Sequence, residues 1–520
     1  MNHPLRLASV FLLAVLLPRL DAQRLEKISL AELRDRIQGG WAGQMIGVSY
    51  GAPTEFRYRE QIIPKDQLPK WTPDRIRNAL NQDDLYVDMT LAKVLDEKGL
   101  EATTEDFGAM FRQAKYALWH ANLAARRALR RGVPAHLTGT PKYNVHAEDI
   151  DFQIEADFIG LMTPGLPQLS NRIAERAGRV MNYADGLYGG MFVSCMYAEA
   201  FFAKDPEKVV RAGLACLPAK SRYYQVISDV IAWARTNPDW ETTWRLIEQK
   251  WNKEEPCPEG ALQPFNIDAA LNGAYIVLGL LYGKGQWEPT LEIATRAGQD
   301  SDCNPASAMG ILGTMIGLSQ IPEIWKAGLP AIENEKFRYT DFTFASIVES
   351  TLRRALAAIE LTGGRRDKDA VWIQRQKAKP AKYEVFIHGS PQQRIPASDS
   401  RWKYVGEWSS PAQPGRQSSY PVQISSQKGA QASISFTGTG VIVSTNFLPT
   451  CGKADVYLNG RLDTTVDCYP DEDSPKYGES LWHAFGLPKR EHHLRIVVRG
   501  EPVFDSRGTE VAITGLIVFH

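Results

Sequence analysis

The sequence has no excess of charge of either sign and, beyond its N-terminus, no long hydrophobic run. Its 520 residues include 60 lysines and arginines and 60 aspartates and glutamates, so the formal net charge is zero. No basic stripe stands out, which argues against nucleic acid as a partner. No segment after residue 22 is apolar over the length that a membrane-spanning helix needs, so we expect no integral membrane segment in the mature chain.

Cysteine is also scarce, with six residues in the whole chain. No spacing between them, or between them and histidine, is typical of a zinc site. Cys451 and Cys468 share one β-rich region and are the pair that we expect to form a disulfide. Cys195 lies in an apolar run, where a cysteine is usually just buried.

The one long apolar run lies at the N-terminus. Arg6 precedes eleven apolar or small residues, 7–17, and Pro18 ends the run before a short segment that offers a cleavage site. A run of this length is too short to span a bilayer and is typical of a secretory signal peptide. A buried first helix is the alternative, which the polar sequence that follows disfavours. We therefore expect a signal peptide at residues 1–22 and an exported protein that is periplasmic, extracellular or envelope-associated.

Residues 24–364 have a helical pattern, and we expect no strand among them. Ser29 and Glu32 have the spacing of a capping box at the start of a helix. Residues 104–131 predict one long helix, with His120 inside it in a structural role. The end of this helix is rich in arginine, for which we expect a solvated face that also suits the helix dipole: Arg126, Arg127, Arg130 and Arg131.

The composition changes after Gly364. Residues 365–382 are charged and polar and predict a linker, and short β-rich runs separated by turns then follow over residues 383–520. We expect a turn at Gly438-Thr-Gly440 and a hairpin at Asn459-Gly460. This part of the chain predicts an all-β sandwich or jelly-roll domain, similar to small accessory modules of secreted carbohydrate-active enzymes. Its tryptophans could stack on sugar, although a core role is at least as plausible for each: Trp402, Trp408 and Trp482.

Two pairs of aspartates carry the strongest chemical signal. Asp83 and Asp84 precede one expected helix, and Asp300 and Asp302 precede another more than two hundred residues later. Aspartate is common at helix N-termini for purely structural reasons, which is the alternative for either pair alone. Four carboxylates that meet at one point, however, require a cation or bound protons. An all-oxygen ligand set favours Mg²⁺, Mn²⁺ or Ca²⁺ over Zn²⁺.

Three motifs in the helical part resemble those of the ADP-ribosylglycohydrolase family, also called the dinitrogenase-reductase-activating glycohydrolase family. Their order, their spacing and the helices that follow them agree with the family. The motifs are Gly43-Gln-Met-Ile-Gly47-Val-Ser-Tyr-Gly51-Ala-Pro53-Thr-Glu55-Phe56, then Gln82-Asp83-Asp84-Leu85, and then Gly298-Gln-Asp300-Ser-Asp302-Cys303-Asn304.

This resemblance implies an all-α catalytic domain with divalent ions in a central cleft. It maps the metal ligands onto the four aspartates: Asp83, Asp84, Asp300 and Asp302. It maps the catalytic acid or base onto Glu55, for which a surface or capping role is the alternative.

The sequence departs from the family pattern around the metal ligands. Gln82 and Cys303 stand where the family has threonines that help to bind metal, so both are candidates for the metal shell. Leu85 replaces another threonine, and Val48 stands where many members have aspartate. A thiol is a poor partner for Mg²⁺. We therefore expect one metal site, for Mg²⁺ or else Mn²⁺ or Ca²⁺, and a second site that is weakened, altered or lost.

Two further groups are candidates for substrate binding. Asp151 and Glu155 have the spacing of one helix face, which is either a solvated acidic face or a wall that faces the substrate. Tyr183, Asp185 and Tyr188 lie in a glycine-rich segment before an apolar helix. Such loops often line sites, although packing and turn formation are the alternative.

Together these features predict an exported, metal-dependent hydrolase that acts on a glycosidic bond. Its partner would be a small-molecule glycoside or a glycan, with an N- or O-glycosidic bond and a sugar diol that the metal holds. A true ADP-ribosyl hydrolase is one alternative, although no clear phosphate loop is present. A non-catalytic glycan-binding protein is the other.

Overall fold

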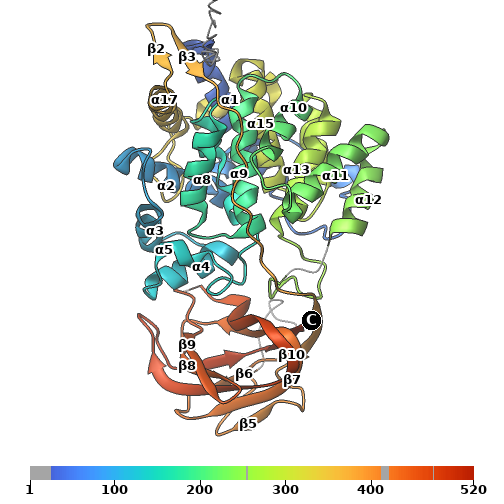
Figure 1. The fold of residues 1–520 in the computed structure, drawn as a ribbon, viewed down its shortest axis with the longest axis vertical. Coiled ribbons are helices and arrows are strands. Elements are labelled where there is room, and N and C mark those ends of the chain that lie inside the picture. Colours follow the sequence, from blue (N-terminus) through green and yellow to red (C-terminus); the bar gives the residue numbers. More distant parts are fainter. Residues whose placement is uncertain (1–24, 253–255, 412–420, 472–473) are drawn as a thin grey trace, which may run out of the picture.

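The structure is a computed structural model that describes residues 25–252, 256–411, 421–471 and 474–520. The expected signal peptide lies outside these described residues. The described chain forms a helical region followed by a β-sheet-rich region, stacked one above the other (Figure 1). The expected all-α domain followed by an all-β region is thereby confirmed.

The helical region is built from a series of helices joined by short turns and by longer loops, some of which contain 3-10 helices. They are α1 (Leu30–Gly51), α2 (Asp83–Lys98), α3 (Thr104–Gln113), α4 (His120–Arg130), α5 (Ala135–Thr138), α6 (Asp151–Ile154), α7 (Asp157–Leu161), α8 (Pro167–Gly178), α9 (Ala184–Ala200), α10 (Pro206–Leu214), α11 (Arg222–Thr236), α12 (Trp240–Trp251), α13 (Ala269–Gly283), α14 (Trp287–Arg296), α15 (Cys303–Ile316), α16 (Glu323–Lys326) and α17 (Phe344–Leu361).

The strands lie at the start of the helical region and, mainly, after it. They are β1 (Leu25–Ser29), β2 (Arg365–Arg366), β3 (Ala370–Gln374), β4 (Pro391–Pro396), β5 (Lys403–Val405), β6 (Gln423–Ser425), β7 (Gln431–Phe447), β8 (Gly452–Leu458), β9 (Arg461–Asp467), β10 (Lys476–Pro502), β11 (Val511–Ile513) and β12 (Gly515–Phe519). The larger sheet has the order β4-β12-β7-β10-β8-β9, with β5 also paired to β7.

Helices α1 and α15 pack at a very short distance, because glycine recurs every fourth residue along α1. A Cβ built on Gly43, Gly47 or Gly51 would come within 3.0 Å of backbone atoms of α15 or of the turn before it. Real Cβ atoms essentially never come so close, and backbone atoms cannot move aside as a flexible side chain would. The glycine-rich first motif therefore fixes the end of α1 against the start of α15.

The expected absence of strands before residue 364 is wrong. β1 pairs antiparallel with β3, and β3 also pairs with β2, so the chain returns to its own beginning after the last helix. The segment expected as a linker, 365–382, thus contributes two strands to the helical region. Ser29, the last residue of β1, caps α1 by accepting a hydrogen bond from the backbone N–H of Glu32.

The single helix expected over residues 104–131 is also wrong, because the structure has two helices, α3 and α4, with a break between them. The side chain of Arg126 donates hydrogen bonds to the carbonyls of Ala114 and Tyr116 in that break. Arg130 donates to the carbonyl of Ala114 as well. Side chains from α4 thus satisfy carbonyls that a continuous helix would have satisfied with its own backbone. His120 stands at the start of α4, with a φ of +42°, and not inside a helix.

The arginine-rich face of α4 packs against the β region, with Arg126 buried and the other three arginines half-buried, and is not the solvated face that we expected. Arg127 and Arg131 both bind the carboxylate of Asp467, at 3.2 Å and 2.5 Å. Arg131 also binds Asp471 at 3.0 Å, and the guanidinium of Arg127 lies 3.7 Å from the ring centre of Phe447. These contacts attach β7 and β9 to the end of the helical region that faces them in Figure 1.

The β region confirms the expected hairpin but not the expected turn. Asn459 and Gly460, both with positive φ, join β8 to β9. The segment from Gly438 to Gly440 continues β7 without a turn. The partner strand β10 has an irregular register at this point, and a Cβ on Gly440 would come within 3.0 Å of the ring of Phe485. The two glycines therefore make room within a bent sheet instead of ending a strand. Trp402 and Trp482 are buried in this region.

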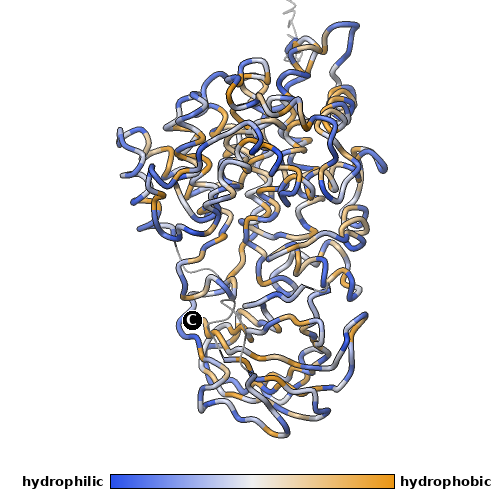
Figure 2. The backbone as a smooth tube through the Cα atoms, turned by 180° about the vertical axis from the view of Figure 1, so that it is seen from behind, coloured by the Kyte–Doolittle hydropathy of each residue, from blue (hydrophilic) through white to orange (hydrophobic). Residues whose placement is uncertain are grey.

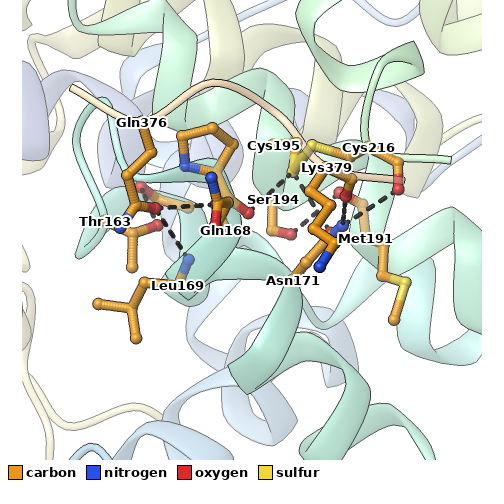
Figure 3. Close-up of a disulfide and its surroundings, with 12 residues drawn as sticks. Thr163, Gln168, Leu169, Asn171, Met191, Ser194, Cys195, Cys216, Gln376 and Lys379 are labelled. Carbon is orange, nitrogen blue, oxygen red and sulfur yellow. Dashed lines mark hydrogen bonds between the residues drawn. A yellow bond between two sulfur atoms is a disulfide. The ribbon is translucent and has the colours of Figure 1, made fainter. Parts of the chain in front are cut away.

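The disulfide joins Cys195 of α9 to Cys216, and the expected Cys451–Cys468 pairing is wrong (Figure 3). Cys451 and Cys468 are buried thiols. Asn171 lies beside the bridge and donates hydrogen bonds to the carbonyls of Cys216 and Lys379, at 3.0 Å and 3.2 Å. The bridge thus lies where the segment after β3 packs on α8 and α9.

Hydrophobic segments are gathered inside both regions (Figure 2). Among the described residues no helix has both the length and the apolar content required to cross a membrane.

Gly47→Ala tests the close packing of α1 on α15. The added methyl group would meet the backbone at Pro305 and Ala306, so we expect the free energy of unfolding to fall by about 1–3 kcal/mol or more. Ala31→Leu, at an exposed position of the same helix, should change it by less than about 0.5 kcal/mol. Chemical denaturation measures both, and equal effects of the two changes would contradict the packing argument.

Asp467→Asn tests the contact between the two regions. Burial alone would raise the pKa of Asp467, but Arg127 and Arg131 lower it to about 2. A lowered pKa means that the carboxylate stabilises the fold above about pH 4, by about 2 kcal/mol, and that this contribution is lost as the pH falls toward 2. The variant also leaves two arginines without their partner, so we expect a loss of about 3–5 kcal/mol at neutral pH.

The difference between wild type and Asp467→Asn should therefore shrink below about pH 4 in thermal unfolding. Asp505→Asn, at an exposed position of the same region, is the matched control. A difference that stays constant down to about pH 2 would contradict the assignment of the lowered pKa to this carboxylate.

Candidate active site and metal centre

The loop after α1 and the loop before α15 are joined by hydrogen bonds. The backbone N–H of Phe56 donates to the carbonyl of Gln299 at 2.9 Å, and the N–H of Gln299 donates to the carbonyl of Tyr58 at 3.0 Å. The hydroxyls of Thr54 and Ser301 lie 2.8 Å apart. Glu55 is thereby held beside the segment that carries Asp300 and Asp302.

The four predicted aspartates and Glu55 lie together in the structure. Asp302 is the residue just before α15, and Asp83 and Asp84 lie in the first turn of α2. The side chains of Asp84, Asp300 and Asp302 are buried, while Asp83 is half-buried and Glu55 is exposed. The centre thus combines three buried carboxyl groups with one that is half-buried and one that is exposed to solvent.

These carboxylates raise one another's pKa. The charges of Asp302 and Asp83, together with burial, raise the pKa of Glu55 above its ordinary value. Burial, and then Asp83 and Asp302, raise the pKa of Asp84 far above the usual range. Burial also raises the pKa of Asp300 to about 7, with a further contribution from Glu55. So much uncompensated negative charge calls for a cation or for bound protons.

The lack of hydrogen-bond partners at two of the aspartates fits a bound metal ion. Within the described part of the chain, neither carboxylate oxygen of Asp84 or Asp300 has a hydrogen-bond partner, although all four atoms are buried. Buried polar atoms are rarely left in this way without an ion or water. Asp300, Asp302 and Cys303 each place a ligand atom within 4.8 Å of the others. The oxygen-rich donor set fits Mg²⁺, Mn²⁺ or Ca²⁺.

A second layer of acids, which the sequence analysis missed, lies behind Asp84. Asp88 accepts a hydrogen bond from Gln44 at 3.4 Å, and Asp157 accepts one from the hydroxyl of Tyr197 at 2.5 Å. Both are fully buried; burial raises the pKa of Asp84 and of Asp88, and the charge of Asp157 raises both further. Asp84 and Asp88 are four residues apart on α2, and this helical spacing is the signal in the sequence that could have revealed Asp88.

Asp151 and Glu155 lie beside the centre and are buried, so they do not form a solvated face. Asn122 holds both, since its backbone N–H donates to Asp151 at 2.8 Å and its side-chain amide donates to Glu155. Burial and Asp151 raise the pKa of Glu155, and the charge of Asp83 raises it further. This last effect places Glu155 near the first turn of α2.

The remaining candidates for substrate binding, Tyr183, Asp185 and Tyr188, make contacts with other parts of the chain. Tyr188 is buried, and its hydroxyl donates to the carbonyl of Lys382 at 2.7 Å, which packs the segment after β3 onto α9. Asp185 forms an ion pair with Arg222 at 3.2 Å. Tyr183 is half-buried at the start of α9. The structure does not bring these three side chains to the four aspartates.

A model of the ADP-ribosylglycohydrolase family matches residues 29–359, which is more than half of the chain. The protein belongs to the ADP-ribosylglycohydrolase family. This membership supports a glycohydrolase-type function and hydrolase activity on glycosidic bonds. The family is typically metal-dependent, in keeping with the candidate metal-binding clusters of the structure.

No curated protein matches the sequence. Among solved structures, an ADP-ribosylglycohydrolase-related protein complex is 17% identical, with a TM-score of 0.40, and the match covers 62% of this chain and 98% of that one. The CBM36-1 domain of a multidomain xylanase, from the hindgut metagenome of Trinervitermes trinervoides, is 11% identical with a TM-score of 0.18. That match covers 24% of this chain and 94% of the other.

Four residues differ from the ADP-ribosylglycohydrolase motifs, and the structure shows where each of them lies. Gln82 is the residue just before α2, and Cys303 is buried with its sulfur 3.9 Å from a carboxylate oxygen of Asp302. Leu85 and Val48 are fully buried in the hydrophobic core and offer no ligand atom. The oxygen ligands are thus concentrated on the four aspartates.

One basic residue near the centre comes from outside the segment that matches the ADP-ribosylglycohydrolase family. Lys476, the first residue of β10, is buried, and its ammonium group lies 4.1 Å from the ring centre of Trp119. Its charge lowers the pKa of Asp83, against the larger effect of burial, which raises it. The β region therefore contributes a positive charge beside the first turn of α2. Sequence reasoning had no signal for this contact between distant segments.

Mg²⁺ should stabilise this member of the ADP-ribosylglycohydrolase family, and more at higher pH. The pKa of Asp300 is raised to about 7, and the protonated acid cannot bind metal, so the rise in melting temperature with Mg²⁺ should be larger at about pH 8 than at about pH 6. Differential scanning fluorimetry across a pH series measures this rise.

The variants Asp84→Asn and Asp300→Asn should lose this rise while being at least as stable as the wild type without metal, because each removes an uncompensated buried charge. Asp66→Asn, at an exposed position, should keep it. A rise that survives in Asp84→Asn, or that becomes smaller with increasing pH, would contradict the assigned metal centre.

Proposed function

We propose that this protein is an exported, metal-dependent glycoside hydrolase. It cleaves the N- or O-glycosidic bond of a sugar whose vicinal hydroxyls bind at the metal centre. The observation that carries the proposal is the meeting of exposed Glu55 with the four aspartates, of which Asp84 and Asp300 are buried and have carboxylate oxygens without a hydrogen-bond partner among the described residues. One group can thus exchange protons with substrate and water, while the others can hold a cation.

Glu55 has the role of the proton-transfer group. Hydrolysis of a glycosidic bond develops positive charge at the anomeric carbon, and a positioned carboxyl group moves a proton to the leaving group or from the attacking water. The hydrogen bonds from Phe56 and Gln299 fix the loop that presents Glu55. A divalent ion on the aspartates supplies a Lewis acid that binds sugar hydroxyls and polarises water.

Export is supported by two independent features. The first is the apolar run at residues 7–17, which has the length and composition of a signal peptide. The second is the Cys195–Cys216 disulfide, since such bridges persist mainly in oxidising compartments.

Hydrolysis of an ADP-ribosyl compound is the second candidate, and Lys476 favours it. A diphosphate needs a cationic partner, and the ammonium group of Lys476 lies near Asp83 and against Trp119. A neutral sugar glycoside has no comparable need for this charge.

Glu55→Gln should abolish most of the hydrolytic activity while the protein still binds Mg²⁺. Loss of one group that transfers protons costs about 100–10,000-fold in kcat. The double variant Asp300→Asn/Asp302→Asn should lose both activity and Mg²⁺ binding, and Glu60→Gln, at a nearby exposed position, should lose neither. The assay uses aryl furanosides, aryl pyranosides and ADP-ribosyl compounds. Full activity in folded Glu55→Gln would contradict the role of this residue.

Lys476→Met separates the two candidate functions. If the substrate is an ADP-ribosyl compound, KM should rise steeply, because a charge-assisted contact to phosphate is lost. If the substrate is a neutral glycoside, KM should change little. The absence of cleavage on the whole panel, together with the absence of bound metal, would contradict both and favour a non-catalytic glycan-binding protein.

A further inference from the structure

A second cluster of metal-ligating side chains lies outside the acidic centre. His120, His146, Asp149 and Cys257 each place a ligand atom within 4.8 Å of the others. His146, Asp149 and Cys257 are 3%, 1% and 0% exposed, and His120 is half-buried. None of these side chains belongs to the four aspartates or to Glu55, so the cluster is distinct from the candidate metal centre described above.

The cluster joins segments that are far apart in the sequence. His120 begins α4, His146 and Asp149 lie between α5 and α6, and Cys257 lies in the segment before α13. The last two segments are joined by the hydrogen bond from the N–H of Ile150 to the carbonyl of Ile267, at 2.9 Å. This backbone contact holds the segment of His146 and Asp149 against the segment that leads from Cys257 into α13.

His146 is oriented as a metal ligand. Its Nδ1 lies 2.7 Å from a carboxylate oxygen of Asp149, and its Nε2 is buried without a hydrogen-bond partner among the described residues. A carboxylate that holds one nitrogen of a histidine while the other nitrogen faces an ion is the usual arrangement around protein-bound zinc. Glu479 of β10 lies on the side of Nε2, and its Oε2 is 3.7 Å from this nitrogen.

We propose that His120, His146 and Cys257 bind a zinc ion, with Asp149 as the carboxylate that orients His146 and with the fourth position facing Glu479. Two imidazoles and a thiolate select zinc over the hard cations that suit the acidic centre. Tetrahedral zinc needs ligand atoms about 3.3–3.8 Å apart, so a small contraction of the cluster completes the site.

The ion would fasten the parts of the chain that surround the acidic centre. It would link three segments: the start of α4, the segment before α6, and the segment that contains Cys257. Asp151 lies in α6, and the ion would also face β10, the strand of Lys476. His120 has a φ of +42°, a strained conformation for a residue with a side chain, and a bond to metal would hold it there.

Metal analysis of the purified full chain after saturation with ZnCl₂ and removal of free metal tests the proposal. We expect one zinc per wild-type chain and no stable zinc in Cys257→Ser or His120→Ala. Asp149→Asn should bind zinc about 10–100-fold more weakly, because only the orientation of His146 is affected. Cys303→Ser is the matched control, since this buried thiol belongs to the acidic centre, and it should retain zinc, as should Asp300→Asn/Asp302→Asn.

Cobalt substitution provides a readout that needs no variant to fold. The wild-type chain loaded with Co²⁺ should show a thiolate-to-cobalt charge-transfer band in the near ultraviolet. It should also show visible absorption bands with the intensity typical of tetrahedral cobalt. A wild-type chain that binds no zinc, a cobalt spectrum without the thiolate band, or zinc retained in Cys257→Ser would each overturn the proposal.

Discussion

The close packing of α1 against α15 is the constraint on which the rest of the structure depends. Glycines at every fourth position of α1 let the two helices approach until backbone meets backbone, and the approach continues to Gly51 at the end of the helix. The loops beyond this contact are then joined by backbone hydrogen bonds at Phe56 and Gln299. Glu55, near the start of the helical sequence, is thereby held beside Asp300 and Asp302, which come more than two hundred residues later.

The acidic centre that results has an electrostatic cost, which a cation would remove. Asp84 and Asp300 are buried with no hydrogen-bond partner for their oxygens among the described residues, and burial and neighbouring charges raise their pKa. A protein evolved for stability alone would place protonated or apolar groups there. The retained carboxylates are best explained by a ligand, and the exposed position of Glu55 beside them allows proton transfer with a substrate.

The sequence was sufficient for those features that depend on local pattern. The change from helical to alternating hydrophobicity near Gly364 predicted the two regions. The two aspartate pairs predicted the acidic centre only together with the resemblance of their motifs to those of the ADP-ribosylglycohydrolase family. Features that depend on contacts between distant segments were missed. The break before α4 exists because Arg126 satisfies carbonyls that lie ten or more residues before it. The Cys195–Cys216 bridge, the charge of Lys476 and the histidine–cysteine cluster likewise have no signature in sequence spacing.

The most direct test of the account is the position of a bound metal in crystals of the full chain soaked with Mn²⁺. An anomalous difference map should show a peak within about 2.0–2.6 Å of carboxylate oxygens of Asp84 and Asp300, near Asp83 and Asp302 and on the same side as Glu55. A map without a peak among these aspartates at saturating Mn²⁺, or with manganese bound elsewhere only, would contradict the central claim that this set of carboxylates is a metal centre.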